Sequence, residues 1–107
     1  MTREEIIAKW AGLTARERDA WVERVVFGGG TYGSFREANG VRVLIPYYTT
    51  VISDAWTVLD SFELGIVTKR EPGVYRAAVL SGLWADEFAS TAPEAIGLAA
   101  IIAKLQN

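Results

Sequence analysis

The clearest pattern of hydrophobic and polar positions lies at residues 48–62, where it follows the period of a helix. At about 100° per residue, the apolar side chains fall within an arc of about 160°, and the polar ones lie opposite. The apolar side chains are those of Val51, Ile52, Ala55, Trp56, Val58, Leu59 and Phe62. The pattern predicts a core helix that begins after Pro46, is capped by Thr49 or Thr50, and stops by Gly65.

Two shorter helices are predicted near the N-terminus. Thr2 with Glu5, and Thr14 with Glu17, have the spacing of a capping box, which marks the start of a helix. The apolar residues that follow are Ile6, Ile7 and Trp10 before a stop at Gly12, and Trp21, Val22, Val25 and Val26 before a stop at Gly28. The charged residues of the second helix are predicted to form an exposed face: Arg16, Glu17, Asp19, Glu23 and Arg24.

Two β-hairpins are predicted on either side of the helix at 48–62. Asn39-Gly40 separates two extended segments and favours a type I′ turn, in which both central residues have positive φ. Pro72-Gly73 lies between segments 66–70 and 74–80 and suits a second tight turn. For residues 81–90 we expect irregular structure or a short strand, although Trp84 and Phe88 also have helical spacing.

The last helix is predicted from Thr91-Ala92-Pro93-Glu94, which has the spacing of a capping box and a proline in the first turn. It runs to about Leu105 and is apolar nearly all round. Its large side carries Leu98, Ile101, Ile102 and Leu105, and its small side carries Ala95, Ala99, Ala100 and Ala103. Such a helix is either buried on several faces or forms a homo-oligomer interface through the large side. We favour cover by the chain's own helices.

Length and composition fit one domain spanning residues 1–107, because half of the residues are apolar and 107 residues suffice for one core. Helices and hairpins together predict an α+β fold. The N-terminus lacks the features of a signal peptide, and no apolar run is long enough to cross a membrane, so we expect a cytoplasmic protein.

The composition limits the chemistry. The chain has no Cys and no His, which removes the commonest metal ligands and the usual general base near pH 7. We therefore expect no enzyme, no cofactor and no metal. A carboxylate-dependent, metal-binding hydrolase is an alternative that would use Asp54, Asp86 or Glu87, but adjacent acids in a strand point to opposite faces.

Binding of nucleic acid or nucleotide is also disfavoured. Arg16, Arg24 and Arg36 are the candidate DNA contacts, but the formal net charge of -2 repels phosphates and no basic run is present. Segment 28–33 has the glycine spacing of a dinucleotide-binding loop. Because a helix precedes these glycines and a strand follows, we interpret the segment as a connector.

Two motifs resemble a known family. Tyr48-Thr49-Thr50-Val51-Ile52 with Ala55-Trp56, and Thr91-Ala92-Pro93-Glu94-Ala95-Ile96, are similar to motifs of the phage ABA-sandwich domain family. Val51 stands where the family has Asp, which puts a role for that carboxylate in doubt. The resemblance implies a three-layer α/β/α sandwich with a small, mainly antiparallel sheet and helices on both faces.

The resemblance also implies a phage or prophage accessory protein of unknown activity in the cytoplasm of a bacterial host. We expect a protein-interaction module whose partner is a phage protein, a host protein or a second copy of the chain. The four Trp residues support this, because a domain of this size has limited room to bury all of them.

Overall fold

A computed structural model, which describes residues 1–106, contains four helices and two antiparallel sheets. The helices are α1 (Arg3–Ala11), α2 (Ala15–Val26), α3 (Ile52–Asp60) and α4 (Ala92–Leu105). The first sheet consists of β1 (Thr31–Tyr32), β2 (Phe35–Ala38) and β3 (Val41–Leu44). The second consists of β4 (Leu64–Glu71), β5 (Val74–Ser81) and β6 (Leu83–Ala89). The predicted α+β class with packed helices and antiparallel strands is confirmed.

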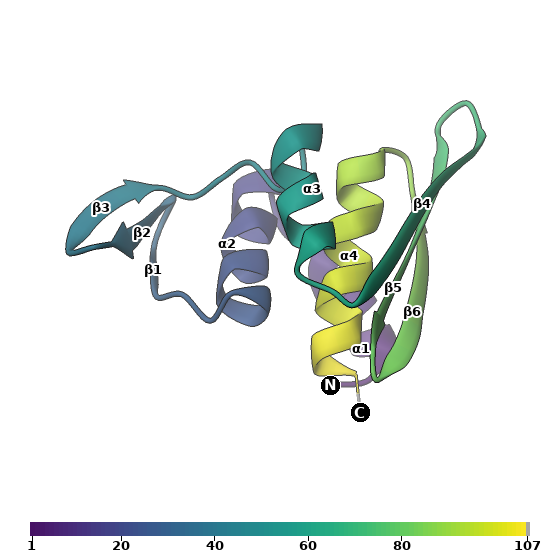
Figure 1. Cartoon of the computed structure of the whole chain (residues 1–107), viewed down its shortest axis with the longest axis horizontal. Coiled ribbons are helices and arrows are strands. Elements are labelled where there is room, and N and C mark those ends of the chain that lie inside the picture. Colours follow the sequence, from purple (N-terminus) through teal and green to yellow (C-terminus); the bar gives the residue numbers. More distant parts are fainter. Residues whose placement is uncertain (107) are drawn as a thin grey trace.

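The layers are arranged along the long axis of the molecule, which measures 41 × 30 × 28 Å (Figure 1). Helix α4 lies along one face of the β4–β6 sheet, α2 and α3 lie beyond α4, and the β1–β3 sheet projects from the opposite end. Within residues 1–106, helices cover only one face of the β4–β6 sheet. The expected cover on both faces is therefore not met, because the two hairpins form separate sheets and the helices pack on one another.

The chain forms α1, α2 and α4 where the caps predict them. Thr2 and Thr14 each accept a hydrogen bond from the N–H of the Glu three residues later, and both Glu side chains return the bond. Thr91 caps α4 in the same way, while the Glu94 carboxylate accepts a bond from Ser90 instead. These contacts satisfy N–H groups that the first turn of a helix leaves unpaired.

Helix α3 differs from the prediction at both ends. Its N-cap is Val51, which offers no side-chain cap, and neither Thr49 nor Thr50 serves that role. The helix ends at Asp60, and Gly65 lies in β4. A Cβ at Gly65 would collide with Cδ1 of Leu59. Gly65 therefore lets strand β4 approach the end of α3 closely rather than stopping the helix.

Both predicted turns are present, and a third strand follows. Asn39 and Gly40 have φ values of 54° and 78°, as a type I′ turn requires. Gly73 has φ 78° between β4 and β5. Gly82 has the same φ and reverses the chain into β6, so residues 83–89 form a regular strand of seven residues. The expectation for segment 81–90 was irregular structure or a short strand, and the structure has a strand that is longer than expected.

The core is centred on α4, which contacts the other three helices and the β4–β6 sheet. Trp10 and Trp21 are buried, with ring centroids 6.5 Å apart. Trp56 was expected in the core but is 46% exposed on α3, so that part of the prediction is wrong. Helix α3 buries Ala55, Val58 and Leu59 instead, and its apolar arc is only partly covered.

Helix α2 buries two carboxylates that were expected on an exposed face. Asp19 accepts hydrogen bonds from the backbone N–H and hydroxyl of Thr49, at 2.9 and 2.7 Å, and from Arg16 at 2.7 Å. One turn later, Glu23 accepts from Tyr48 Oη and Arg36. The polar face of α2 therefore binds and stabilises the segment between β3 and α3, whose backbone makes few hydrogen bonds of its own.

The buried end of α3 gives a test of the fold. We expect Leu59→Ala to lower the free energy of unfolding by about 2 to 5 kcal/mol, because it leaves a cavity against Gly65. Asp60→Ala, at the exposed neighbouring position, should change it by less than about 0.5 kcal/mol. Urea unfolding of both variants measures the difference, and equal losses would contradict the observed packing of α3.

Candidate functional site

The face of the β4–β6 sheet that points away from α4 carries large apolar side chains. We call it the outer face. Register places its residues in three cross-strand rows, Leu64–Leu80–Trp84, Ile66–Ala78–Asp86 and Thr68–Arg76–Phe88. The side chains of Leu64, Ile66, Trp84 and Phe88 are 56%, 50%, 51% and 55% exposed. The outer face is therefore a sheet surface whose apolar groups have no cover within residues 1–106.

The opposite face explains why these side chains lie outside. Residues Val67, Ala77, Val79 and Ala85 pack in the core toward the helices, and two of the four are alanines. Small side chains let α4 approach the strands closely, and the period of two along a strand then places the larger neighbours outward. Glu87 also points inward, where Arg3 of α1 binds it with two bonds of 2.8 Å.

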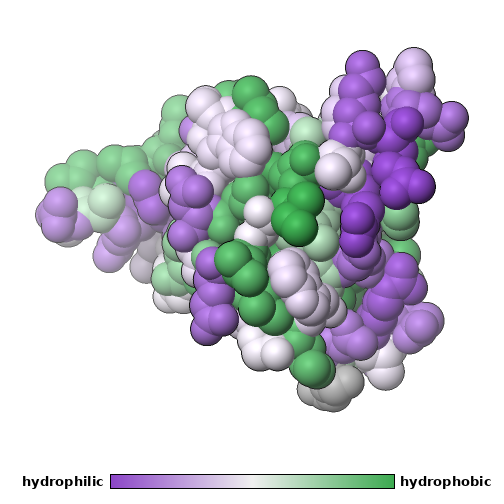
Figure 2. Space-filling view, turned by 45° about the vertical axis from the view of Figure 1, so that its right-hand side comes forward, coloured by the Kyte–Doolittle hydropathy of each residue, from purple (hydrophilic) through white to green (hydrophobic). Residues whose placement is uncertain are grey.

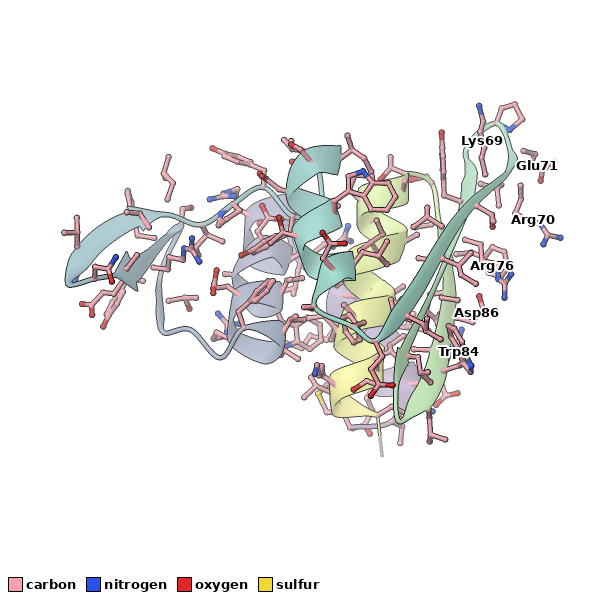
Figure 3. All side chains as sticks on the ribbon, in the orientation of Figure 1. Lys69, Arg70, Glu71, Arg76, Trp84 and Asp86 are labelled. Atoms are coloured by element: carbon pink, nitrogen blue, oxygen red, sulfur yellow. The ribbon has the colours of Figure 1, made fainter. Side chains whose placement is uncertain are left out.

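One ion pair lies among the apolar side chains of the outer face (Figure 3). Arg76 Nε donates to Asp86 Oδ1 at 2.7 Å, and a second guanidinium nitrogen donates to the other carboxylate oxygen. The hydrogen bonds from Arg76 hold the pKa of Asp86 below its usual value, so the pair is charged at neutral pH. Next to it lies a shallow hollow of about 240 Å³, lined by Ile66, Arg76, Ala78, Trp84 and Asp86.

Charged side chains border the outer face at the tip of the β4–β5 hairpin. Lys69, Arg70 and Glu71 lie there, above Arg76, Asp86 and Trp84 (Figure 3). In the surface view, hydrophilic side chains cover the projecting hairpin (Figure 2). The site thus has apolar side chains with charge at one end, which is the composition of a protein contact surface with a polar rim.

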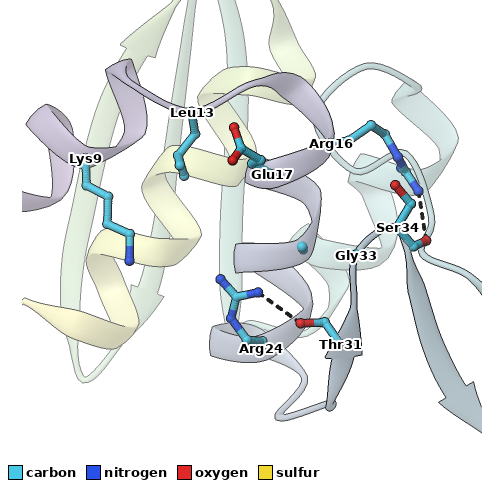
Figure 4. Close-up of a pocket in the computed structure, with 9 residues that line it drawn as sticks. Lys9, Leu13, Arg16, Glu17, Arg24, Thr31, Gly33 and Ser34 are labelled. Atoms are coloured by element: carbon cyan, nitrogen blue, oxygen red, sulfur yellow. Dashed lines mark hydrogen bonds between the residues drawn. The ribbon is translucent and has the colours of Figure 1, made fainter.

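A second hollow lies between α1, α2 and the start of the β1–β3 sheet (Figure 4). It has a volume of about 330 Å³, and Lys9, Arg16, Glu17 and Arg24 line it. Most of these groups already have partners. Arg16 binds Asp19, Arg24 donates to the Thr31 hydroxyl at 3.0 Å, and Glu17 accepts from the N–H of Thr14. Lys9 lies 4.4 Å from the ring centre of Trp21. The hollow therefore offers little unsatisfied chemistry to a ligand.

The glycine segment at 28–33 leads into this second hollow through Gly33. It follows α2 and continues into β1 and β2, so no helix begins at the glycines. The N–H groups of a helix start, which receive phosphate in a dinucleotide-binding loop, are not placed there.

The candidate interface residues of α4 lie inside the protein. Leu98, Ile101 and Ile102 are buried, and Leu105 is partly buried against the same core. Helices α1, α2 and α3 all contact α4. Of the two arrangements that the sequence left open, the structure has the one in which the chain's own helices provide the cover. In this arrangement the large side of α4 is not available to a partner.

The candidate metal-binding carboxylates are held apart by different partners. Asp54 accepts from the backbone N–H of Tyr47 at 2.8 Å, Asp86 binds Arg76, and Glu87 binds Arg3 on the other face of the sheet. Asp86 and Glu87 point to opposite faces, as predicted for neighbours in a strand. Across residues 1–106, no three acidic side chains are grouped as metal ligands would be.

The candidate DNA contacts do not form a basic surface. Arg16 binds the buried carboxylate of Asp19, and Arg36 binds that of Glu23 at 3.2 Å. Arg24 donates to Thr31. Two of the three arginines are therefore neutralised by carboxylates within the chain.

The sequence did not point to the outer face, although a signal was present. Trp84, Asp86 and Phe88 alternate with Ala85, Glu87 and Ala89, which is the period of a strand with a large side and a small side. Trp84 and Phe88 also have helical spacing, so the segment was left ambiguous. Regarding this alternation as a strand would have placed both aromatic rings on one face.

Comparisons with known proteins show that the chain is similar to a phage protein. No family model matches the sequence, and no curated protein matches it. Among solved structures, the chain is similar to a phage protein from Bacillus cereus ATCC 14579, whose crystal structure was determined at 2.0 Å. The two are 27% identical, the match covers 86% of this chain and 93% of that one, and the TM-score is 0.76.

The resemblance to a phage protein of unknown function is supported by this likeness in both fold and sequence. The ABA-sandwich family itself stays a resemblance, since no family model matches. For the membrane question, the helices within residues 1–106 are all too short or too polar to cross a bilayer.

Proposed function

We propose that the protein is a phage or prophage accessory protein that acts by binding another protein through the outer face. The observation that carries the proposal is the exposure of Leu64, Ile66, Trp84 and Phe88 together on one sheet face. Single exposed apolar residues are ordinary, but several large ones on one face indicate a contact surface. The partner is a phage protein, a host protein or a second copy.

The energetics favour Trp84 as the centre of the contact. Burial of apolar surface contributes about 25 cal/mol per Å², and a half-exposed Trp offers more such surface than the other side chains of the face. Trp residues are also enriched among the few residues that dominate the affinity of an interface. The shallow hollow beside Trp84 gives an incoming side chain a place to pack.

Hydrolysis and binding of nucleic acid have less support. A metal-dependent hydrolase needs several oxygen ligands that converge, whereas Asp54, Asp86 and Glu87 each bind a different group. A surface for nucleic acid needs cations that are free to meet phosphates, whereas Arg16 and Arg36 meet buried carboxylates.

The test compares two tryptophans with similar exposure on different surfaces. The wild type, Trp84→Glu and Trp56→Glu are immobilised and exposed to lysate from cells that carry the phage or prophage. The protein recovered by the wild type is identified, purified and measured by calorimetry, with a second copy as the other partner tested. We expect Trp84→Glu to weaken binding at least about 30-fold, and Trp56→Glu less than about threefold.

Circular dichroism and the midpoint of urea unfolding establish that both variants are folded. If Trp84→Glu binds as tightly as the wild type, the outer face is not the contact surface. The proposal is also overturned if neither a recovered protein nor a second copy binds the wild type.

A further inference from the structure

We infer that the outer face binds the outer face of a second copy, so that the protein forms a twofold-symmetric dimer. This inference rests on the proposed function, because it names the partner of the same surface. A twofold interface must be complementary to itself, with residue i of each copy facing residue j of the other. The outer face meets this condition in its charges, its apolar rows and its shape.

The charges of the outer face are balanced. Its rows hold one carboxylate, Asp86, and one guanidinium, Arg76, on neighbouring strands. The axis of a face-to-face dimer lies between the two sheets and parallel to them. If it runs diagonally over Ala78, Arg76 of each copy lies opposite Asp86 of the other. The dimer then contains two Arg76 cations and two Asp86 anions in alternation, with Arg70, whose charge also acts on Asp86, as a further cation at the border of the face.

The same axis matches the apolar rows. On the register of the sheet, it places Leu64 opposite the same residue of the other copy, and Ile66 opposite Leu80. Phe88 likewise lies opposite its own counterpart. Trp84 lies opposite Thr68, so each large apolar side chain of the rows except Trp84 faces another apolar group. A partner with a different charge arrangement would need its own complement to Arg76 and Asp86, whereas a second copy supplies one by symmetry.

The shape of the face permits close contact. Ala78, at the centre, has a small side chain that is almost fully buried by its neighbours. The hollow around it accepts side chains from the opposing sheet, so the two sheets can approach the spacing of about 10 Å that is typical of packed sheets. The diagonal axis makes the strands of the two sheets cross steeply, as in orthogonal packing.

The size of the face predicts a reversible dimer. Three strands of seven or eight residues give a face about 10 Å by 25 Å, so the outline areas of two copies sum to roughly 500 Å², below the total of about 1,000 Å² expected of a stable interface. We therefore expect association that depends on concentration in the micromolar range. Pairing through the edge of β6 is disfavoured, because inward-pointing Glu87 is a charge that discourages further strands.

The test uses charge reversal and mixing. Arg76→Asp gives a face with two carboxylates, and Asp86→Arg gives a face with two guanidinium groups. Sedimentation velocity over about 1 to 500 μM follows the monomer–dimer equilibrium, a range set by the expected micromolar association. We expect the wild type to dimerise and each variant alone to dimerise at least about tenfold more weakly. An equimolar mixture should recover dimers, because the acidic face of one variant complements the basic face of the other.

A matched control reverses a charge pair on the other sheet. Glu37 and Arg42 lie directly opposite each other on β2 and β3, and both are exposed. Glu37→Arg and Arg42→Asp should leave the dimerisation constant of the wild type unchanged within about twofold, because neither lies on the outer face.

Each outcome decides a different point. One outcome is a wild type that stays monomeric at about 500 μM, the top of the range tested, together with a Trp84→Glu variant that no longer binds a protein recovered from the lysate. This outcome overturns the dimer and leaves the proposed function standing. A wild-type dimer that neither charge variant weakens forms through another surface, and this also overturns the inference. If both variants are monomeric and their mixture is too, Arg76 and Asp86 do not face each other across the axis.

Discussion

Ile101→Glu is expected to abolish folding. Ile101 is fully buried near the middle of α4, the helix that contacts the other three helices and the β4–β6 sheet. An ionised carboxylate there would lose its hydration without gaining a partner, and protonation would still leave an unsatisfied polar group. The cost of several kcal/mol is comparable with the total stability of about 5 to 15 kcal/mol for a domain. Loss of cooperative urea unfolding and of the native circular dichroism spectrum measures the effect.

Two controls on the same helix separate this effect from a general intolerance of α4 to change. Ile101→Val removes one methylene and should cost about 0.5 to 1.5 kcal/mol. Lys104→Glu reverses an exposed charge that lies 5.2 Å from the ring centre of Phe62, and the chain should remain folded. A folded monomer of Ile101→Glu, obtained from a wild-type dimer, would show that α4 is the interface and that the observed burial is wrong.

The elements that local chemistry defines could be predicted from the sequence. Thr2, Thr14 and Thr91 cap helices, and Asn39-Gly40 adopts the positive φ values of a hairpin turn. In each case the signal is a hydrogen bond or a backbone preference within a few residues. The start of α3 has no such signal. The N–H groups of Thr50 and Val51 bond to the carbonyl of Tyr47, and Asp54 accepts from the N–H of Tyr47, so the backbone itself forms the turn.

The layer order and the outer face could not be predicted in this way. Alternation along β6 shows which side chains share a face, but it does not show which face the helices cover. Large side chains such as Trp84 and Phe88 are ordinarily the buried set. Here α4 packs closely on small residues such as Ala77 and Ala85, and the larger ones face outward. That choice depends on the contacts of α4 with strands that are distant in the sequence.

The charges of α2 were misinterpreted for a related reason. Asp19 and Glu23 are one turn apart and surrounded by other charges, which is also the pattern of a solvated helix face. What distinguishes them is the segment that packs on them. Residues 45–51 lack strand or helix partners for much of their backbone, so they require acceptors from elsewhere. Helix α2 supplies these acceptors. The hydrophobic and polar pattern of α2 alone does not show that another segment needs them.

Asp19→Ala should therefore be strongly destabilising, by about 3 to 5 kcal/mol in urea unfolding. Without this carboxylate, the N–H and hydroxyl of Thr49 lose an acceptor in a buried site, and the guanidinium of Arg16 loses its anion. Each buried donor that is left unsatisfied costs about 1 to 3 kcal/mol. Arg16 keeps its bond of 2.8 Å to the carbonyl of Ile45, so the segment is weakened rather than released outright.

Asp19→Asn separates the two parts of this cost. The amide oxygen can still accept from Thr49, whereas the charge opposite Arg16 is gone, so the loss should be smaller, at about 1 to 3 kcal/mol. A solvated carboxylate would give the opposite result, because either substitution on an exposed helix face changes stability by less than about 0.5 kcal/mol. If Asp19→Ala unfolds at the urea concentration of the wild type, segment 45–51 is held by something other than α2. A buried acceptor at position 19 therefore predicts that the free energy of unfolding is lowest for Asp19→Ala, intermediate for Asp19→Asn and highest for the wild type. A surface charge predicts no such order.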